Sequence, residues 1–225
     1  MTLFSSRFFW LFLFFATVCQ AQTDVYFQPE ISVNHSPKNR WSFNFQLANR
    51  NLVIKDGAHF LEAQQLEFSH FTSYESGFYS KVSLGVMYRN KDWFNPENSD
   101  EYRVTEQYSF AKKYNALRLS HRLRTEQRYY TGNTVYRGRY RFAADFPLQG
   151  ASLNHKEFYG SLSAEVLYSL SAKMSPELDQ RFTTTLGKQI TEQLKLQLGL
   201  EYRFENYLNE KSERILISTS AIYKI

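Results

Sequence analysis

Arginine recurs at short intervals in residues 121–142, where it is interleaved with tyrosine. The stretch reads HRLRTEQRYYTGNTVYRGRYRF and holds six arginines, and Arg118 lies just upstream. A guanidinium group is a planar, permanently charged fork that binds carboxylates and phosphates through paired hydrogen bonds. Arginines mixed with tyrosine rings are typical of a surface that binds nucleic acid or another polyanion. The position of this stretch in the fold decides between those uses.

The other residues that could do chemistry form no catalytic or metal-binding pattern. The five histidines lack spacings such as HxH or HExxH. Ser120 and His121 are adjacent, and neighbours on a strand point to opposite faces, so they do not form a Ser–His pair. Glu201 and Glu205 share a strand face with Arg203 between them, which favours a salt-bridge ladder over acid–base catalysis. We therefore expect no catalytic residues, no metal site and no cofactor.

The first residues of the chain predict that the protein is exported. MTLFSSRFFWLFLFFATVCQAQ has a basic residue, Arg7, then an apolar run over 8–18 and small residues ending at Ala21. This pattern predicts a secretory signal peptide over 1–21, cleaved near Ala21, and a mature domain over 22–225. The apolar run is shorter than the roughly 20 residues that a membrane-spanning helix needs.

Composition agrees with a single exported domain. The chain has 225 residues, a net charge of +5 and 17% aromatic residues, enough for one domain with a sizeable core and too aromatic for disorder. Its one cysteine, Cys19, lies inside the expected signal peptide. We therefore expect a mature chain without thiols or disulfides. Export also argues against a nucleic-acid partner.

Apolar and polar residues alternate with a period of two along the expected mature chain. In LKLQLGLEYRF (194–204), leucine and aromatic residues occupy every second position and polar residues or glycine the others. WSFNFQL (41–47) and ILISTSAIYKI (215–225) repeat the pattern. A helix would scatter these residues around its circumference, whereas a strand sorts them onto two faces. Turn residues separate about eleven such runs, several of them longer than the usual five or six residues, and we expect no helix after the signal peptide.

Three features favour a membrane barrel over a soluble one. The runs reach the roughly 9–11 residues that a tilted strand needs to cross a bilayer. Aromatic residues such as Tyr129, Tyr130, Tyr207 and Tyr223 gather near the ends of the runs, where interfacial girdles occur. The polar face is unusually rich in charges that can pair across strands. We expect an all-β, antiparallel, up-and-down transmembrane β-barrel. Since single-chain bacterial barrels have an even number of strands, we expect ten or twelve and favour twelve.

In this frame the arginine-rich stretch becomes a hairpin turned at TGNT (131–134), with its arginines on the inward face. The residues that we expect to form a polar network inside the barrel are Arg118, Arg122, Arg124, Glu126, Arg128, Arg137, Arg139, Arg141, Asp145, Glu165, Arg181, Glu201, Arg203 and Glu205. The arginines outnumber the carboxylates, so the expected interior is net positive.

Five segments of the chain resemble a known family. They are LSHRLRTEQRY (119–129), YRGRYRFAADFPL (136–148), SLSAEVLYSL (161–170), LDQRFTTTLG (178–187) and LQLGLEYRF (196–204). Together they resemble the uncharacterised outer-membrane β-barrel family called domain of unknown function 2490, over essentially the whole mature chain. The resemblance implies an outer-membrane barrel in a Gram-negative cell and implies no established activity.

The sequence therefore favours an outer-membrane barrel that is either structural or a narrow pore favouring anions. Rings of arginine select anions, whereas a small barrel is often filled by its own paired side chains. The alternatives are a barrel-embedded hydrolase acting on lipid or peptide and a soluble exported ligand-binding barrel. The expected partners are membrane lipid, the outer-membrane assembly machinery and a small anionic solute or lipid.

Overall fold

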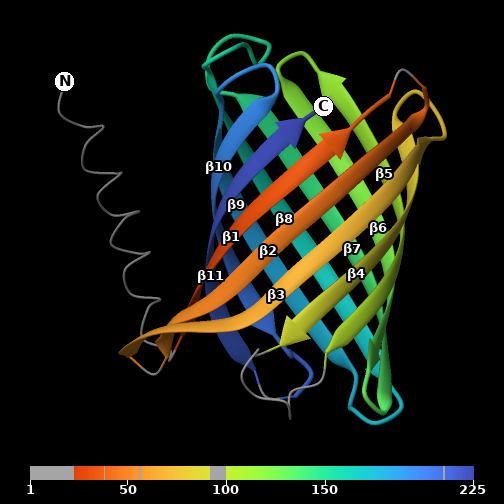
Figure 1. Ribbon diagram of the computed structural model, residues 1–225, viewed down its shortest axis with the longest axis vertical. Helices are drawn as coiled ribbons and strands as arrows, with labels where there is room; N and C mark the ends of the chain where they lie inside the picture. The colour runs from red at the N-terminus through yellow and green to blue at the C-terminus, as the bar shows by residue number, and fades with distance from the viewer. Residues whose placement is uncertain (1–22, 38, 56, 92–99, 210) are drawn as a thin grey trace.

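The computed structural model describes residues 23–225, except for 38, 56, 92–99 and 210, and these residues form a closed β-barrel (Figure 1). Its strands are β1 Asp24–His35, β2 Trp41–Lys55, β3 Ala58–Glu75, β4 Ser80–Lys91, β5 Glu101–Tyr114, β6 Leu117–Tyr130, β7 Asn133–Pro147, β8 Phe158–Ser171, β9 Glu177–Gln189, β10 Leu194–Glu205 and β11 Ser212–Lys224. The predicted all-β barrel is confirmed. The described part of the chain holds no helix long and apolar enough to cross a membrane. The signal peptide predicted over 1–21 lies outside the described residues.

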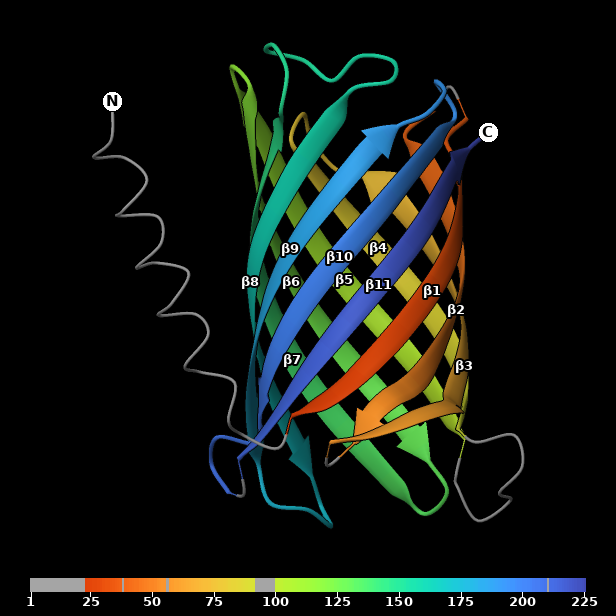
Figure 2. The same cartoon turned by 90° about the vertical axis from the view of Figure 1, so that its left-hand side faces the viewer.

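The barrel has eleven described strands, and its closure differs from the expected one. Each strand pairs antiparallel with the next, while β1 and β11 pair in parallel from Asp24↔Arg214 to Asn34↔Lys224. The number lies within the predicted range of ten to twelve, but the even count, with twelve favoured, is wrong. An odd count leaves the first and last strands running in the same direction, so only a parallel pair can close the ring. As a result β1 begins at one rim, here the N-terminal rim, and β11 ends at the other, the C-terminal rim (Figure 2).

The period-two alternation places large apolar side chains on the outside of the barrel. On β10, Leu196, Leu198 and Leu200 are 45%, 53% and 54% exposed, while the residues between them face inward. The same holds along β4, where Leu84 and Val86 are more than half exposed. The apolar face is therefore the outer surface, and polar residues fill the interior.

Aromatic side chains gather on this outer surface near both rims. Trp41 and Tyr74, on paired strands at the C-terminal rim, have ring centroids 5.0 Å apart. Tyr88 and Tyr102, paired near the N-terminal rim, have centroids 5.1 Å apart. Between the two rows the outer surface combines exposed leucines and valines with rings such as Phe68 and Tyr140. Glu106 is a charged exception, and the hydroxyl of Thr125 donates a hydrogen bond to it at 3.0 Å.

Aromatic rings also lie across glycines on neighbouring strands. Phe71 of β3 is paired with Gly85 of β4, and its ring carbons come within 2.3–2.7 Å of the place where a Cβ on Gly85 would stand. Tyr159 of β8 covers Gly187 of β9 in the same way. At these positions the missing side chain makes room for the ring.

Replacing such a glycine should strain the wall. We expect Gly85→Ala to lower the free energy of unfolding by about 1–3 kcal/mol, because the added methyl group must displace the Phe71 ring. Urea unfolding followed by tryptophan fluorescence measures the change. Gly138→Ala is the matched control, since a Cβ there meets nothing within 4 Å, and it should be neutral or slightly stabilising. Equal losses in the two variants would contradict the argument.

Candidate functional site: the charged interior

The barrel encloses a central cavity of about 950 Å³ whose lining is dominated by positive charge. Its wall includes fourteen cationic side chains, twelve arginines and two lysines, against six carboxylates. Side chains from both halves of the chain contribute, because the closed sheet turns one face of every strand toward the same space. The cavity is thus a polar compartment built on a single sheet.

The structure brings most of the residues predicted for the polar network into this cavity. Ten of them line it: Arg122, Arg124, Arg128, Arg137, Arg139, Arg141, Arg181, Glu201, Arg203 and Glu205. Glu126 and Glu165 are buried in the wall, 1% and 6% exposed. Arg118 and Asp145 form an ion pair at 3.2 Å and line a separate cavity of about 250 Å³ toward the C-terminal rim.

One fully buried carboxylate, Glu101 on β5, collects three guanidinium groups. Arg128 binds both of its oxygens, through Nε at 2.7 Å and Nη2 at 2.9 Å. Arg103 binds it at 2.5 Å and Arg89 at 2.9 Å. The hydroxyl of Tyr130, which the sequence placed with the interfacial aromatics, points inward and donates to it at 2.9 Å. The carboxylate of Glu101 therefore links the neighbouring strands β4, β5 and β6.

The network continues along the wall through Arg139 on β7. Its Nη1 donates to Glu126 at 2.6 Å and its Nη2 to Glu165 at 2.7 Å, so one guanidinium bridges two buried acids. Arg103 approaches Glu126 at 3.7 Å, and Arg122 donates to Glu165 at 3.1 Å. The charges of β4 to β8 form one continuous chain of ion pairs.

A second cluster lies on β9, β10 and β11. Nε of Arg203 donates to Glu201 at 2.5 Å, and Arg214 donates to Glu205 at 2.8 Å. Arg181 and Arg203 each lie 3.9 Å from Glu205. Glu201, Arg203 and Glu205 thus form a salt-bridge ladder on one strand rather than an isolated pair of carboxylates.

Four of the fourteen cations, Arg50, Lys91, Arg141 and the exposed Lys211, have no carboxylate within ion-pair distance among the described residues. Arg50 donates only to the amide oxygen of Gln28, at 2.9 and 2.8 Å. Lys91 stands 4.5 Å from the centre of the Tyr130 ring. Arg141 lines both the central cavity and the one at the C-terminal rim. The positive charge of the interior is therefore compensated only in part.

Several residues of the observed network are absent from the predicted one. Glu101 directly follows the polar segment 91–100, which has the composition of a loop. Its alternation with Arg103 nevertheless indicates that both side chains point inward. Arg89 follows the same rule on β4. Arg50 has the same parity as the inward residues Ser42, Asn44 and Gln46, and the irregularity in the pairing of β2 with β3 begins only after it. The period-two pattern therefore indicates an inward position for all three residues.

Contacts of the histidines do not assemble a hydrolytic site. Both Ser120 and His121 line the cavity at the C-terminal rim. They are neighbours on β6 and project from opposite faces of the strand, and Nδ1 of His121 lies 2.8 Å from the hydroxyl of Tyr140. His70 contacts the hydroxyl of Thr72 at 3.0 Å, on the outer face. Within the described residues, no group of three or more His, Cys, Asp and Glu side chains could hold a metal ion.

Comparison with known proteins gives one match. The profile of a family described as protein of unknown function (DUF2490) matches residues 23–214, from the start of the barrel into β11. No curated protein and no solved structure matches the chain. The match covers the predicted interior network completely.

Removing the acid at the centre of the first network should destabilise the barrel. We expect Glu101→Gln to lower the free energy of unfolding by about 3–5 kcal/mol, because it leaves the buried Arg128 without a paired carboxylate, whereas Arg89 keeps Glu67 and Arg103 keeps Glu126. Urea unfolding measures the loss. The control is Glu75→Gln, which breaks an ion pair with Lys81 whose side chains are 49% and 46% exposed, and it should cost about 0–1 kcal/mol. A small effect at Glu101 would show that the interior tolerates the excess charge.

Proposed function

The chain belongs to the DUF2490 family of proteins of unknown function, and since that description assigns no activity, we propose from the geometry a role for this barrel. It is an outer-membrane protein whose positively charged interior favours the passage of small anions. The observation that carries the proposal is the excess of fourteen cations over six carboxylates around the central cavity.

The outer surface supports the membrane part of the proposal. Exposed leucines and valines form a belt between two rows of aromatic side chains, as at Trp41 and Tyr102. A hydrocarbon layer stabilises such a belt, whereas water does not, and aromatic girdles mark the two interfaces. The signal peptide expected over 1–21 supplies export. Membrane lipid and the outer-membrane assembly machinery are then the partners of the barrel.

The charge of the interior supports the preference for anions. Even when the buried Glu101, Glu126 and Glu165 are added to the six lining carboxylates, the cations outnumber the acids. A field of one sign is focused by low-dielectric walls, so it raises the local concentration of small anions and lowers that of cations. Arg50, Lys91 and Arg141 contribute most to this field because no carboxylate pairs with them.

Smaller cavities join the central one toward both rims. The cavity at the C-terminal rim shares Arg122 and Arg141 with it. A cavity of about 350 Å³ at the N-terminal rim shares Arg128 and Arg137. A solute that moved along the barrel would meet arginine at each junction. This arrangement favours a narrow anion path over the structural alternative, a barrel plugged by its paired side chains.

We expect the protein to behave as a membrane barrel in two measurements. Cell fractionation should place it with the outer membrane, and the unheated protein should migrate faster than the boiled protein on a detergent gel, because the folded barrel is compact. A protein recovered in the soluble periplasmic fraction, with identical migration before and after heating, would support the soluble exported barrel instead.

The anion preference should depend on the unpaired arginines. In planar bilayers under a salt gradient, we expect the reversal potential to show a preference for chloride over potassium. Arg141→Gln should reduce that permeability ratio at least about twofold, because it removes an uncompensated charge from a junction between two cavities. Arg40→Gln, a matched loss of charge outside the barrel wall, should leave the ratio unchanged. Absence of conductance in correctly folded protein would favour the plugged barrel.

A further inference from the structure

At the N-terminal rim, the geometry points to a binding site for a phosphoryl group, either of a soluble phosphate or of a phosphorylated headgroup. The site is a cavity of about 280 Å³, here called the cation pocket, lined by Arg50, Lys91, Arg203, Arg214, Tyr26 and Gln64 among others. The inference deepens the proposed function and rests on it for the role of the site, since it names the class of anion that the same interior holds.

Charge distinguishes the cation pocket from the rest of the interior. Of the described side chains that line it, four are cationic and none is a carboxylate, whereas six described carboxylates line the central cavity. The cations come from four strands, β2, β4, β10 and β11, which lie within the part of the wall that runs from β10 through β11 and β1 to β4. Arg203 and Arg214 are already paired with Glu201 and Glu205, whereas Arg50 and Lys91 have no ion pair among the described residues. The two uncompensated charges repel each other in the empty state, and an anion of charge −2 relieves that repulsion. A dianion is therefore better matched to this pocket than a halide.

Hydrogen-bond donors in the cation pocket are only partly used. Nε and Nη2 of Arg50 donate to Gln28, which leaves Nη1 without an acceptor among the described residues. Arg203 uses Nε for Glu201, and its Nη1 lies 3.9 Å from Glu205. Lys91 makes a cation–π contact with Tyr130 and no ion pair within the described chain. Donors from three strands therefore stay available for a ligand.

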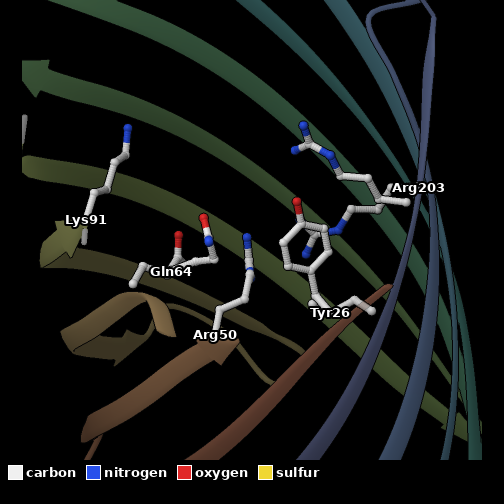
Figure 3. Close-up of a pocket in the computed structure, with 8 residues that line it drawn as sticks. Tyr26, Arg50, Gln64, Lys91 and Arg203 are labelled. Atoms are coloured by element: carbon white, nitrogen blue, oxygen red, sulfur yellow. The ribbon is translucent and has the colours of Figure 1, made fainter. Parts of the chain in front are cut away.

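Figure 3 shows how these groups face one space. The side chains of Lys91 and Arg203 reach in from opposite sides, and Arg50, Gln64 and the Tyr26 ring lie between them. Guanidinium forks match the oxygen pairs of a phosphoryl group, and an ammonium adds a compact point charge. The Tyr26 hydroxyl and the Gln64 amide add neutral groups that suit an ester or protonated oxygen.

Size fits the same ligand class. The pocket has room for roughly nine water molecules at about 30 Å³ each, more than one inorganic phosphate needs and enough for a phosphate monoester. It shares Arg50, Lys91, Arg203 and Arg214 with the central cavity, so a soluble ligand can reach it through the barrel. A lipid headgroup would instead enter from the rim.

The test is calorimetric titration of the purified full-length mature barrel with inorganic phosphate and, separately, chloride, at constant ionic strength so that screening is equal. We expect phosphate to bind more tightly than chloride. Arg50→Gln should weaken phosphate binding on the order of tenfold, the effect of losing a hydrogen bond to a charged group. Arg141→Gln removes an equally unpaired arginine outside the cation pocket and should change the affinity by less than about twofold.

A second arm separates the two sources of the phosphoryl group. Short-chain phosphatidic acid, used below its micellar concentration, replaces inorganic phosphate. Tight binding of both ligands supports a soluble phosphate monoester, and binding of phosphatidic acid alone supports a lipid headgroup. Lys91→Gln serves if Arg50→Gln does not fold, because Lys91 makes no ion pair with any described residue, and it should weaken binding in the same direction.

The outcomes also separate this inference from the proposed channel. If the barrel bound phosphate but conducted no ions, the phosphoryl site would be supported and the proposed channel would be contradicted. If the barrel conducted anions but bound neither phosphate nor phosphatidic acid more tightly than chloride, the phosphoryl site would be contradicted. The proposed channel would still be supported. If Arg50→Gln and Arg141→Gln weakened phosphate binding equally, the affinity would depend on the overall charge of the interior. The assignment of the phosphoryl group to the cation pocket would then be overturned.

Discussion

Burial of charge inside a closed sheet is the constraint on which this structure depends. Glu101 is fully buried, and the cost of removing its carboxylate from water is met by guanidinium groups of β4, β5 and β6. Arg139 extends the chain of ion pairs to Glu126 and Glu165. Because a one-residue slip of any strand would turn its charges outward, this network also specifies the register of the wall. Packing of apolar residues cannot do so here, since the apolar face lies outside.

The arginines of the interior are used in two ways. Along β4 to β8 the buried acids Glu101, Glu126 and Glu165 bind several guanidinium groups, among them those of Arg128 and Arg139. Arg50, on β2, donates to a neutral amide, and Arg141 has no bound acid. An uncompensated buried charge costs stability, so its presence beside well-paired charges indicates a use other than holding the fold. The proposed anion path and the cation pocket both draw on these unpaired groups.

Alternation of residue types in the sequence is sufficient to predict the strands and their faces. It placed ten of the fourteen predicted network residues around the central cavity, because the direction of a side chain on a strand follows from local parity alone. It could not tell that Arg139 bridges two acids, since this depends on how three strands align. Glu101 borders the polar segment 91–100, which obscures the start of its strand, and Arg50 lies three residues beyond the clearly alternating run 41–47. The number of strands is a property of closure, which joins residues nearly 200 positions apart, such as Asp24 and Arg214.

Closure by a parallel pair has a topological consequence. Eleven strands make five hairpins and one strand left over, and each hairpin returns the chain to the rim from which it started. The leftover strand alone carries the chain from one rim to the other. In a bilayer, the residue before β1 and the residue after β11 would therefore face different compartments. A reporter fused at each end would label opposite sides of the membrane, whereas in a barrel with an even number of strands both would label the same side.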